Sequence, residues 1–119
     1  MKIILASKSK RRHELLKNLE FDFTIAASNF DESSIKTTNP EEYCQKAAHS
    51  KAQTIANKHS ECAVIGADTI VCINKQILGK PSNYNEAFKM LKLLSNKIHF
   101  VYTGVSIILK SKSINLNFI

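Results

Sequence analysis

Three consecutive basic residues, Lys10 to Arg12, follow directly after Ser9, a residue type that often caps the start of a helix. Leucines follow at helical spacing, so we expect these cations in the first helical turn. A helix N-terminus carries partial positive charge, and each cation there costs roughly a few tenths of a kcal/mol. The same terminus offers free backbone N–H groups to anions, and Arg11 and Arg12 add guanidinium forks that suit phosphate oxygens. The stretch from Ser7 onward therefore predicts a phosphate site, with a solvated basic turn as the alternative.

A second candidate is Asp68, an acid inside the apolar run of residues 62–73. A carboxylate in a buried strand costs roughly several kcal/mol unless it is paired or bound to a metal. Gly66 and Ala67 precede it, and these small residues leave room for a ligand. We expect a functional carboxylate here, either a general base or a metal ligand. The alternative is a structural aspartate that is hydrogen-bonded to nearby backbone N–H groups.

Further charged residues lie on segments that could converge on the same site. Lys80 stands between a glycine and a proline in a loop after a strand, a location that suits a phosphate contact. Asp31 and Glu32 are adjacent acids in a polar loop, and their oxygens suit a hard cation such as Mg²⁺. Lys51 lies beside an alanine-rich helix face and either reaches into a cleft or extends into solvent. Each of these residues could also be solvated, but together they suit a metal-bound nucleotide.

The elements that would position these residues alternate between strands and helices. We expect strands at 3–6, 21–27, 62–73, 99–110 and 113–119, with a hairpin after residue 73. We expect helices at 10–19 and 39–59, and a third that starts after Asn83. This order predicts an α/β or α+β fold with a mixed, twisted sheet flanked by helices, in a single domain that spans residues 1–119.

The composition is that of a globular domain with an excess of basic residues. The chain has 119 residues, 44% of them hydrophobic, and 17 basic residues against 10 acidic ones give a formal charge of +7. This charge favours a polyanionic partner, but no stripe of basic and aromatic residues predicts nucleic-acid binding. No apolar run approaches the roughly 18 residues of a membrane span, and no signal peptide is apparent, so we expect a cytoplasmic protein without a membrane partner. The cysteines and histidines show no metal-ligand spacing.

Seven short motifs occur in order along the chain: LASKSKRRHELL, DES, KA at Lys51-Ala52, GADTIV, ILGKP, AFKMLKLLS and HFVYTGVS. With this order and spacing the chain closely resembles the Maf family, also called septum formation proteins, over its whole length. The resemblance implies an inosine-triphosphatase-like fold and a function in nucleotide metabolism. The implied activity is that of a nucleoside triphosphate pyrophosphatase, a hydrolase that releases the monophosphate and pyrophosphate with a divalent metal cation, Mg²⁺ or Mn²⁺.

The resemblance also implies roles for individual residues. Asp68 is the implied proton acceptor and, with Glu32, an implied metal ligand. Arg11 and Thr69 are implied to help set substrate choice. The implied phosphate contacts are Ser7, Arg11, Arg12, Lys51 and Lys80. The triplet around Asp68 resembles members that act on dTTP and UTP. The alternative branch, which acts on 7-methyl-GTP, tends to have a tryptophan before its arginines and a glutamine after its aspartate, and this chain has neither.

Two features depart from the family pattern. Lys10 stands where members usually have a proline. Members also run on for tens of residues, with a further strand pair and a G-I-Q motif whose glutamine contacts the substrate. We therefore expect a fold that is incomplete at the C-terminus, weak or absent turnover by this chain alone, and self-association, for example as a homodimer, through an exposed C-terminal strand. A non-catalytic nucleotide-binding or cell-division regulatory protein is the alternative to an enzyme.

Overall fold

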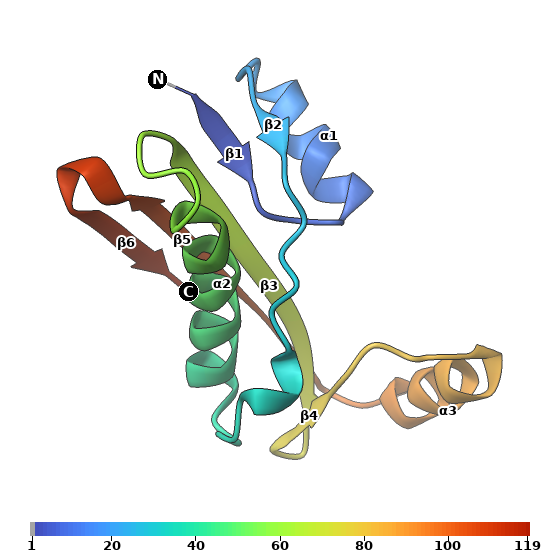
Figure 1. Ribbon diagram of the computed structural model, residues 1–119. Coiled ribbons are helices and arrows are strands. Elements are labelled where there is room, and N and C mark those ends of the chain that lie inside the picture. The colour runs from blue at the N-terminus through green and yellow to red at the C-terminus, as the bar shows by residue number, and fades with distance from the viewer. Residues whose placement is uncertain (1) are drawn as a thin grey trace.

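The longest strand, β3 (Ala63–Ile73), is the centre of a six-stranded mixed sheet in the computed structural model, which describes residues 2–119 (Figure 1). The strand order is β2-β1-β3-β5-β6, and the short β4 also pairs with β3. The other elements are β1 (Ile3–Leu5), α1 (Lys10–Asn18), β2 (Thr24–Ile25), a 3-10 turn (Glu32–Ser34), α2 (Pro40–Ala56), β4 (Gln76–Leu78), α3 (Tyr84–Leu94), β5 (Phe100–Leu109), a second 3-10 turn (Lys110–Lys112) and β6 (Ile114–Phe118). The predicted α/β class and mixed sheet are confirmed.

One edge of β3 is open in the middle of the strand. The parallel strand β1 pairs with β3 as far as Leu5↔Ile65, whereas the antiparallel strand β4 begins to pair only at Val71↔Leu78. On the opposite edge, β5 pairs with β3 without a break from residue 64 to residue 72. Residues 66–70 of β3 therefore have a strand partner on one side only, so loops and side chains can approach the other side.

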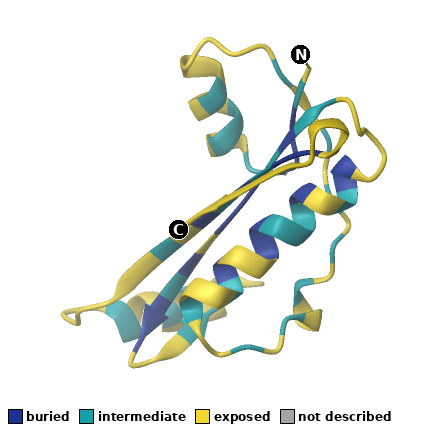
Figure 2. Ribbon diagram, turned by 90° about the vertical axis from the view of Figure 1, so that its left-hand side faces the viewer, coloured by how far each residue is buried: buried dark blue, intermediate teal, exposed yellow. Residues whose placement is uncertain are grey.

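Helix α2 lies against the sheet (Figure 2), and it packs directly on β3 and β5 because small residues lie on both sides of the contact. Ala48 and Ala52 are fully buried on the helix. A Cβ atom at Gly66 of β3 would lie 2.8 Å from the backbone nitrogen of Ala52, and one at Gly104 of β5 would lie 2.7 Å from the carbonyl oxygen of Cys44. Only glycine fits at these two positions, so the helix backbone lies closer to the sheet than any side chain would allow.

The other two helices add little to the core. Neither α1 nor α3 has a buried residue, and α3 stands apart from the sheet beyond β4 (Figure 1). Tyr84 and Leu91 of α3 are 80% and 69% exposed, although its apolar residues follow the predicted helical spacing. The core cluster comes from β1, α2, β3 and β5 and the residue after β1: Ile4, Ala6, Ala52, Ile55, Ala56, Val64 and Ile108. Within residues 2–119, no helix has the length and apolar character needed to cross a bilayer.

The predicted starts of the three helices and the predicted hairpin after β3 are confirmed. The side chains of Ser9, Asn39 and Asn83 each accept a hydrogen bond from the backbone N–H three residues further on, as N-caps do. Asn74 and Lys75 have φ angles of 50° and 63°, the left-handed conformation that a two-residue hairpin loop requires. These short-range interactions set where the helices begin and where β3 turns into β4.

The strand predicted at 21–27 is wrong over most of its length. β2 contains only Thr24 and Ile25, which pair in parallel with Ile4 and Leu5. Because β1 is itself three residues long, it offers few backbone partners to β2. Phe21 is 53% exposed, so the apolar alternation in this segment does not mark a buried face.

Strand β6 forms one edge of the sheet and is exposed along its whole length. It pairs with β5 from Leu109↔Ile114 to Val105↔Phe118, and its other edge has no strand partner within residues 2–119. Alternate side chains of a strand share one face, which puts Ile114, Leu116 and Phe118 together, as predicted. All three are exposed, so an apolar strip follows an open strand edge.

We expect Gly66→Ala to destabilise the fold, because the added methyl group would overlap backbone atoms of α2. The free energy of unfolding should fall by about 1–3 kcal/mol, the range for overpacking a core. Gly79→Ala is the matched control, since a Cβ atom there meets no other atom within 4 Å. Denaturant unfolding of both variants measures the difference, and equal stabilities would contradict the close approach of α2.

We also expect the chain to self-associate through β6. An unpaired strand edge offers N–H and C=O groups to a second copy, and the apolar strip beside it adds surface to bury. Light scattering at increasing concentration should show a rising apparent mass. Leu116→Lys should lower that mass by placing a charge on the apolar face, and Asn115→Lys, on the opposite face, should have a smaller effect. A wild-type mass that stays at the monomer value at every concentration would contradict this prediction.

Candidate active site

Most of the predicted phosphate-binding residues converge on the open edge of β3. Ser7 lies in the loop after β1, Arg12 in the first turn of α1, and Lys80 in the loop after β4. With Lys51 of α2 and Glu32 of the 3-10 turn, they line a cavity of about 400 Å³. Segments that are far apart in the sequence therefore meet at one cavity, and cations form much of its lining.

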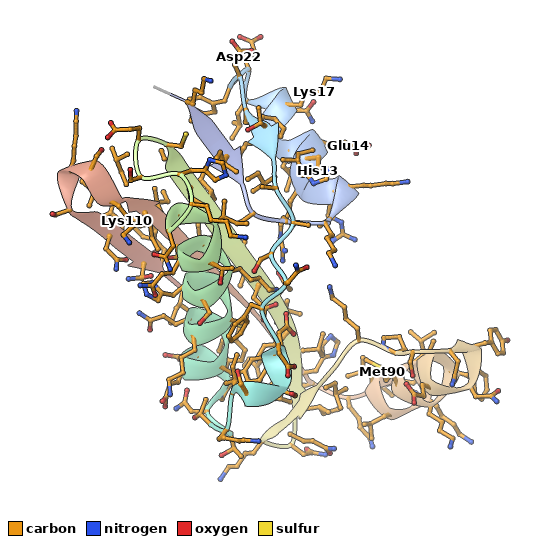
Figure 3. All side chains as sticks on the ribbon, viewed as in Figure 1. His13, Glu14, Lys17, Asp22, Met90 and Lys110 are labelled. Carbon is orange, nitrogen blue, oxygen red and sulfur yellow. The ribbon has the colours of Figure 1, made fainter. Side chains whose placement is uncertain are left out.

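A second cavity of about 220 Å³ adjoins the first, and Glu32 and Lys80 line both. Asp68 and Thr69 of β3 lie on its wall, and Met90 of α3, labelled in Figure 3, lies on another part of its lining. The two cavities can therefore hold different parts of one elongated ligand, with Glu32 and Lys80 at the junction.

Lys51 joins the two predicted carboxylates. Its Nζ lies 2.7 Å from Oε1 of Glu32 and 2.9 Å from Oδ1 of Asp68. The side chains of Lys51 and Asp68 are 17% and 5% exposed, whereas that of Glu32 is 39% exposed. The buried aspartate is thus held by a salt bridge, and the alternative that it is hydrogen-bonded to backbone N–H groups is wrong.

One carboxylate oxygen of Asp68 is available to a ligand. Its Oδ2 is buried and has no hydrogen-bond partner among residues 2–119, and leaving such an atom unpaired is costly. Mg²⁺ prefers oxygen donors and is typically held by one or two carboxylates, with substrate phosphates and water completing its shell. No group of three or more His, Cys, Asp or Glu side chains converges in the described part of the chain. Asp68 and Glu32 therefore fit a metal ion that takes its other ligands from a substrate.

The pKa values of the buried ion pair are both raised, for different reasons. Burial raises the pKa of Asp68 because it disfavours the charged carboxylate; the hydrogen bond and charge of Lys51 lower it by less, and Glu32 raises it further. Burial acts to lower the pKa of Lys51, but the bonds and charges of both carboxylates together outweigh burial and raise it. Lys51 is therefore a firmly held cation, and Asp68 is more basic than a surface aspartate.

The turn between β1 and α1 is held in a fixed shape around Ser7, which is buried. The Ser7 Oγ accepts a hydrogen bond from the backbone N–H of Ser9 at 3.1 Å, and Nε2 of His13 donates to the Ser7 carbonyl oxygen at 2.9 Å. Ser7, Lys8 and Ser9 all line the larger cavity, so the start of α1 lies beside it, as an anion site requires. Lys8 and His13 carry no distinctive signal in the local sequence, so their places at this turn are not predictable from the sequence alone.

Only one of the two predicted arginines reaches the larger cavity. Arg12 lines it, and its guanidinium donates to the carbonyl oxygen of Ala67 at 3.2 Å and to Oγ1 of Thr69 at 3.0 Å. Arg11 is exposed and does not line either cavity. Successive residues of a helix point about 100° apart, so α1 turns one arginine toward β3 and the other toward solvent. The role predicted for Arg11 in substrate choice stays a prediction.

The architecture belongs to the class of Ham1-type folds. The Ham1 protein of Staphylococcus aureus superimposes with a TM-score of 0.64 at 18% identity, over 99% of this chain and 68% of that one. The nucleoside-triphosphatase / dITP/XTP pyrophosphatase of Mycobacterium abscessus superimposes with a TM-score of 0.61 at 15% identity, over 99% of this chain and 70% of that one. The likeness confirms the predicted fold.

Within this class, sequence comparison gives the particular family. Residues 2–117 match the family described as Maf-like protein, and the chain belongs to the Maf family. The dTTP/UTP pyrophosphatase of Thermoanaerobacter sp. (strain X514) is 50% identical over 109 residues, which are 91% of this chain and 56% of that protein. The protein of the same name from Clostridium novyi (strain NT) is 47% identical over 119 residues, covering 98% of this chain and 62% of that protein. The chain thus spans less than two thirds of the length of these relatives.

Replacing Lys51 tests the ion pair. Lys51→Met keeps the length of the side chain but leaves two carboxylates close together without a cation. The free energy of unfolding at neutral pH should fall by about 3–5 kcal/mol, the cost of removing one partner of a buried ion pair. The pKa of Lys51 is higher in the folded protein than in the unfolded chain. In the wild type, the stabilisation by Lys51 is therefore fully present at pH values below its unfolded-state pKa. It is lost only as the pH rises through its folded-state pKa.

The variant should also gain an unusual pH dependence. Burial raises the pKa of Asp68, and without Lys51 nothing nearby opposes that effect as strongly. Protonation removes the unpaired buried charge, so the deficit of Lys51→Met relative to wild type should shrink as the pH falls through the raised pKa of Asp68. Urea unfolding at several pH values measures this. Lys46→Met, which breaks an exposed pair with Glu42, is the matched control. A pH-independent deficit in Lys51→Met would contradict the assignment.

Proposed function

We propose that this chain forms the phosphate-binding and catalytic part of a nucleoside triphosphate pyrophosphatase that converts dTTP and UTP to the monophosphate and pyrophosphate. The observation that carries the proposal is the buried Asp68, paired with Lys51 and keeping one unpartnered oxygen beside cavities lined by cations. Relatives named dTTP/UTP pyrophosphatase support this activity and these substrates.

In the proposed complex the triphosphate lies in the larger cavity. The start of α1, with Ser7 and Ser9, offers N–H and O–H donors to phosphate oxygens. Arg12 and Lys80 add positive charge from two different elements, and charge-assisted hydrogen bonds to phosphate are about twice as strong as neutral ones. These groups bind the substrate and stabilise the charge that develops on the leaving pyrophosphate.

Asp68 acts as the general base in this proposal. A water molecule attacks the α-phosphorus, its oxygen forms the new P–O bond, and the bond between the α-phosphorus and the bridging oxygen of the pyrophosphate breaks. The proton of the water passes to Asp68, and the electron pair leaves with pyrophosphate. Burial raises the pKa of Asp68 and so makes it a better proton acceptor than a surface aspartate, while the adjacent Lys51 favours its ionised form.

The same carboxylates would hold a divalent cation, Mg²⁺ or Mn²⁺. Asp68 and Glu32 are its proposed protein ligands, because both converge on Lys51 and Asp68 keeps an unpartnered oxygen. When bound, such a cation neutralises phosphate charge and polarises the phosphoryl group. Lys51 holds both carboxylates in position from the side of α2.

The alternatives are less well supported. No relative described above is named for 7-methyl-GTP, and Thr69 rather than glutamine follows Asp68. A non-catalytic nucleotide-binding protein would not need a buried acid with an unpartnered oxygen. Nucleoside triphosphates are cytoplasmic metabolites, so we place the proposed activity in the cytoplasm.

A pyrophosphate-release assay with a panel of nucleoside triphosphates and Mg²⁺ or Mn²⁺ tests this proposal. Because the chain spans only part of the length of its relatives, we expect weak turnover, with UTP and dTTP preferred over purine nucleotides. The rate should fall as the pH drops through the raised pKa of Asp68, because the base must be ionised. Asp68→Asn should keep nucleotide binding but lose at least about 10²-fold in rate, the low end for general acid–base catalysis.

Asp22→Asn is the matched control, because Asp22 is exposed and lies outside both cavities (Figure 3). Near-normal hydrolysis by a folded Asp68→Asn protein would remove Asp68 from the mechanism. Saturable UTP binding without any pyrophosphate release by the wild type would instead support the non-catalytic alternative.

A further inference from the structure

We propose that Thr103 is a positioning residue for Arg12 and acts on it through Thr69. The inference rests on the proposed function of the larger cavity as a phosphate site. Hydrogen bonds link the three side chains in a line, from Thr103 on β5, across Thr69 on β3, to Arg12 at the start of α1. Thr103 carries none of the roles implied by the family resemblance.

Arg12 is held on β3 at two points. Its Nη1 donates to the carbonyl oxygen of Ala67 at 3.2 Å, and its Nη2 donates to Oγ1 of Thr69 at 3.0 Å. A guanidinium has five N–H donors in one plane, so these two bonds fix that plane and leave the other N–H groups for a ligand in the cavity. Of the two anchors, the carbonyl belongs to the rigid strand, whereas the Thr69 hydroxyl can rotate about its side-chain bond.

Thr103 restricts that rotation. The two threonines lie directly opposite each other in the antiparallel pair of β3 and β5, and their Oγ1 atoms are 3.0 Å apart. The Thr69 oxygen accepts a bond from Arg12, so the bond with Thr103 uses either the Thr69 proton or its remaining lone pair. If Thr69 is the donor, the chain of bonds also polarises its oxygen and strengthens its bond with Arg12. Thr103 thus keeps the Thr69 hydroxyl aimed at Arg12.

The position of Thr103 separates this role from ligand binding and from core packing. Thr103 lines neither cavity, so its effect on a ligand is indirect. Its side chain is exposed, so water can satisfy a hydroxyl there and the core does not depend on it. Valine has the same shape and favours strands, so replacing the hydroxyl by a methyl group leaves β5 intact.

Isothermal titration of the chain with UTP in the presence of Mg²⁺ tests the inference. Thr103→Val should raise the dissociation constant by about two- to tenfold, the net effect of one hydrogen bond. Thr103→Ser, which restores a hydroxyl, should recover most of the wild-type affinity. Thr24→Val removes the hydroxyl of another exposed strand threonine, in β2, and should leave the affinity unchanged.

A double-mutant cycle with Arg12→Ala distinguishes positioning from a general structural effect. If Thr103 acts through Arg12, Thr103→Val should cause no further loss in the Arg12→Ala background, whereas independent effects would add. Additive losses, or wild-type affinity in Thr103→Val alongside weakened binding in Arg12→Ala, would overturn this inference and leave the proposed function standing. A wild-type chain that binds no UTP would overturn the proposed function, and this inference with it.

Discussion

The close approach of α2 to the sheet is the contact on which the candidate site depends. Ala48 and Ala52 bring the helix backbone against Gly66 so closely that no side chain fits between them. Asp68 lies two residues after Gly66 on the same face of β3, and Lys51 immediately precedes Ala52 on the helix. The contact that joins Ala52 to Gly66 therefore also brings Lys51 to Asp68. A larger side chain at Gly66 would push α2 outward and separate the two charges, so the packing of small residues sets the electrostatics of the site.

The site that results has charges of opposite sign on different elements. Lys51 is a single cation between two carboxylates, so the acids on β3 and the 3-10 turn keep an excess of negative charge and an unpartnered Asp68 oxygen. Arg12 and Lys80 bring positive charge from α1 and from the loop after β4. A metal-bound triphosphate has the complementary arrangement, with a cation at one part and negative oxygens along the rest. This complementarity explains why the fold tolerates a buried acid that costs free energy when the site is empty.

The sequence predicts those parts of the fold and site that depend on short-range signals. Caps, a hairpin turn and the alanine-rich face of α2 all follow from neighbouring residues, and the buried acid in an apolar run marks Asp68. The pairing of strands is harder to predict from sequence. The alternation at 21–27 is typical of a strand, but it does not show that the partner strand β1 is only three residues long and so limits the length of β2. The sequence also does not show which of Arg11 and Arg12 faces the cavity, since that depends on how α1 is rotated about its axis relative to β3. The link from Thr69 to Thr103 requires the register of two strands that lie far apart in sequence.

The basic start of α1 can now be explained by how the helix is attached. Because α1 has no buried residue, polar bonds attach its start: Arg12 bonds to the backbone of β3, and His13 to the carbonyl oxygen of Ser7.

Three cations at a helix N-terminus oppose the helix dipole, each at roughly a few tenths of a kcal/mol, so they weaken the free protein slightly. An anion in the larger cavity reverses the sign of that interaction for Arg12, because it meets both the free N–H groups of the helix start and the Arg12 guanidinium. Since the Arg12 guanidinium is already fixed before a ligand arrives, binding orders one side chain fewer and costs less entropy. The helix start is thus slightly less stable in the free protein but forms a prepared anion site, and this accounts for Arg12 at a position where helix formation alone would disfavour a cation.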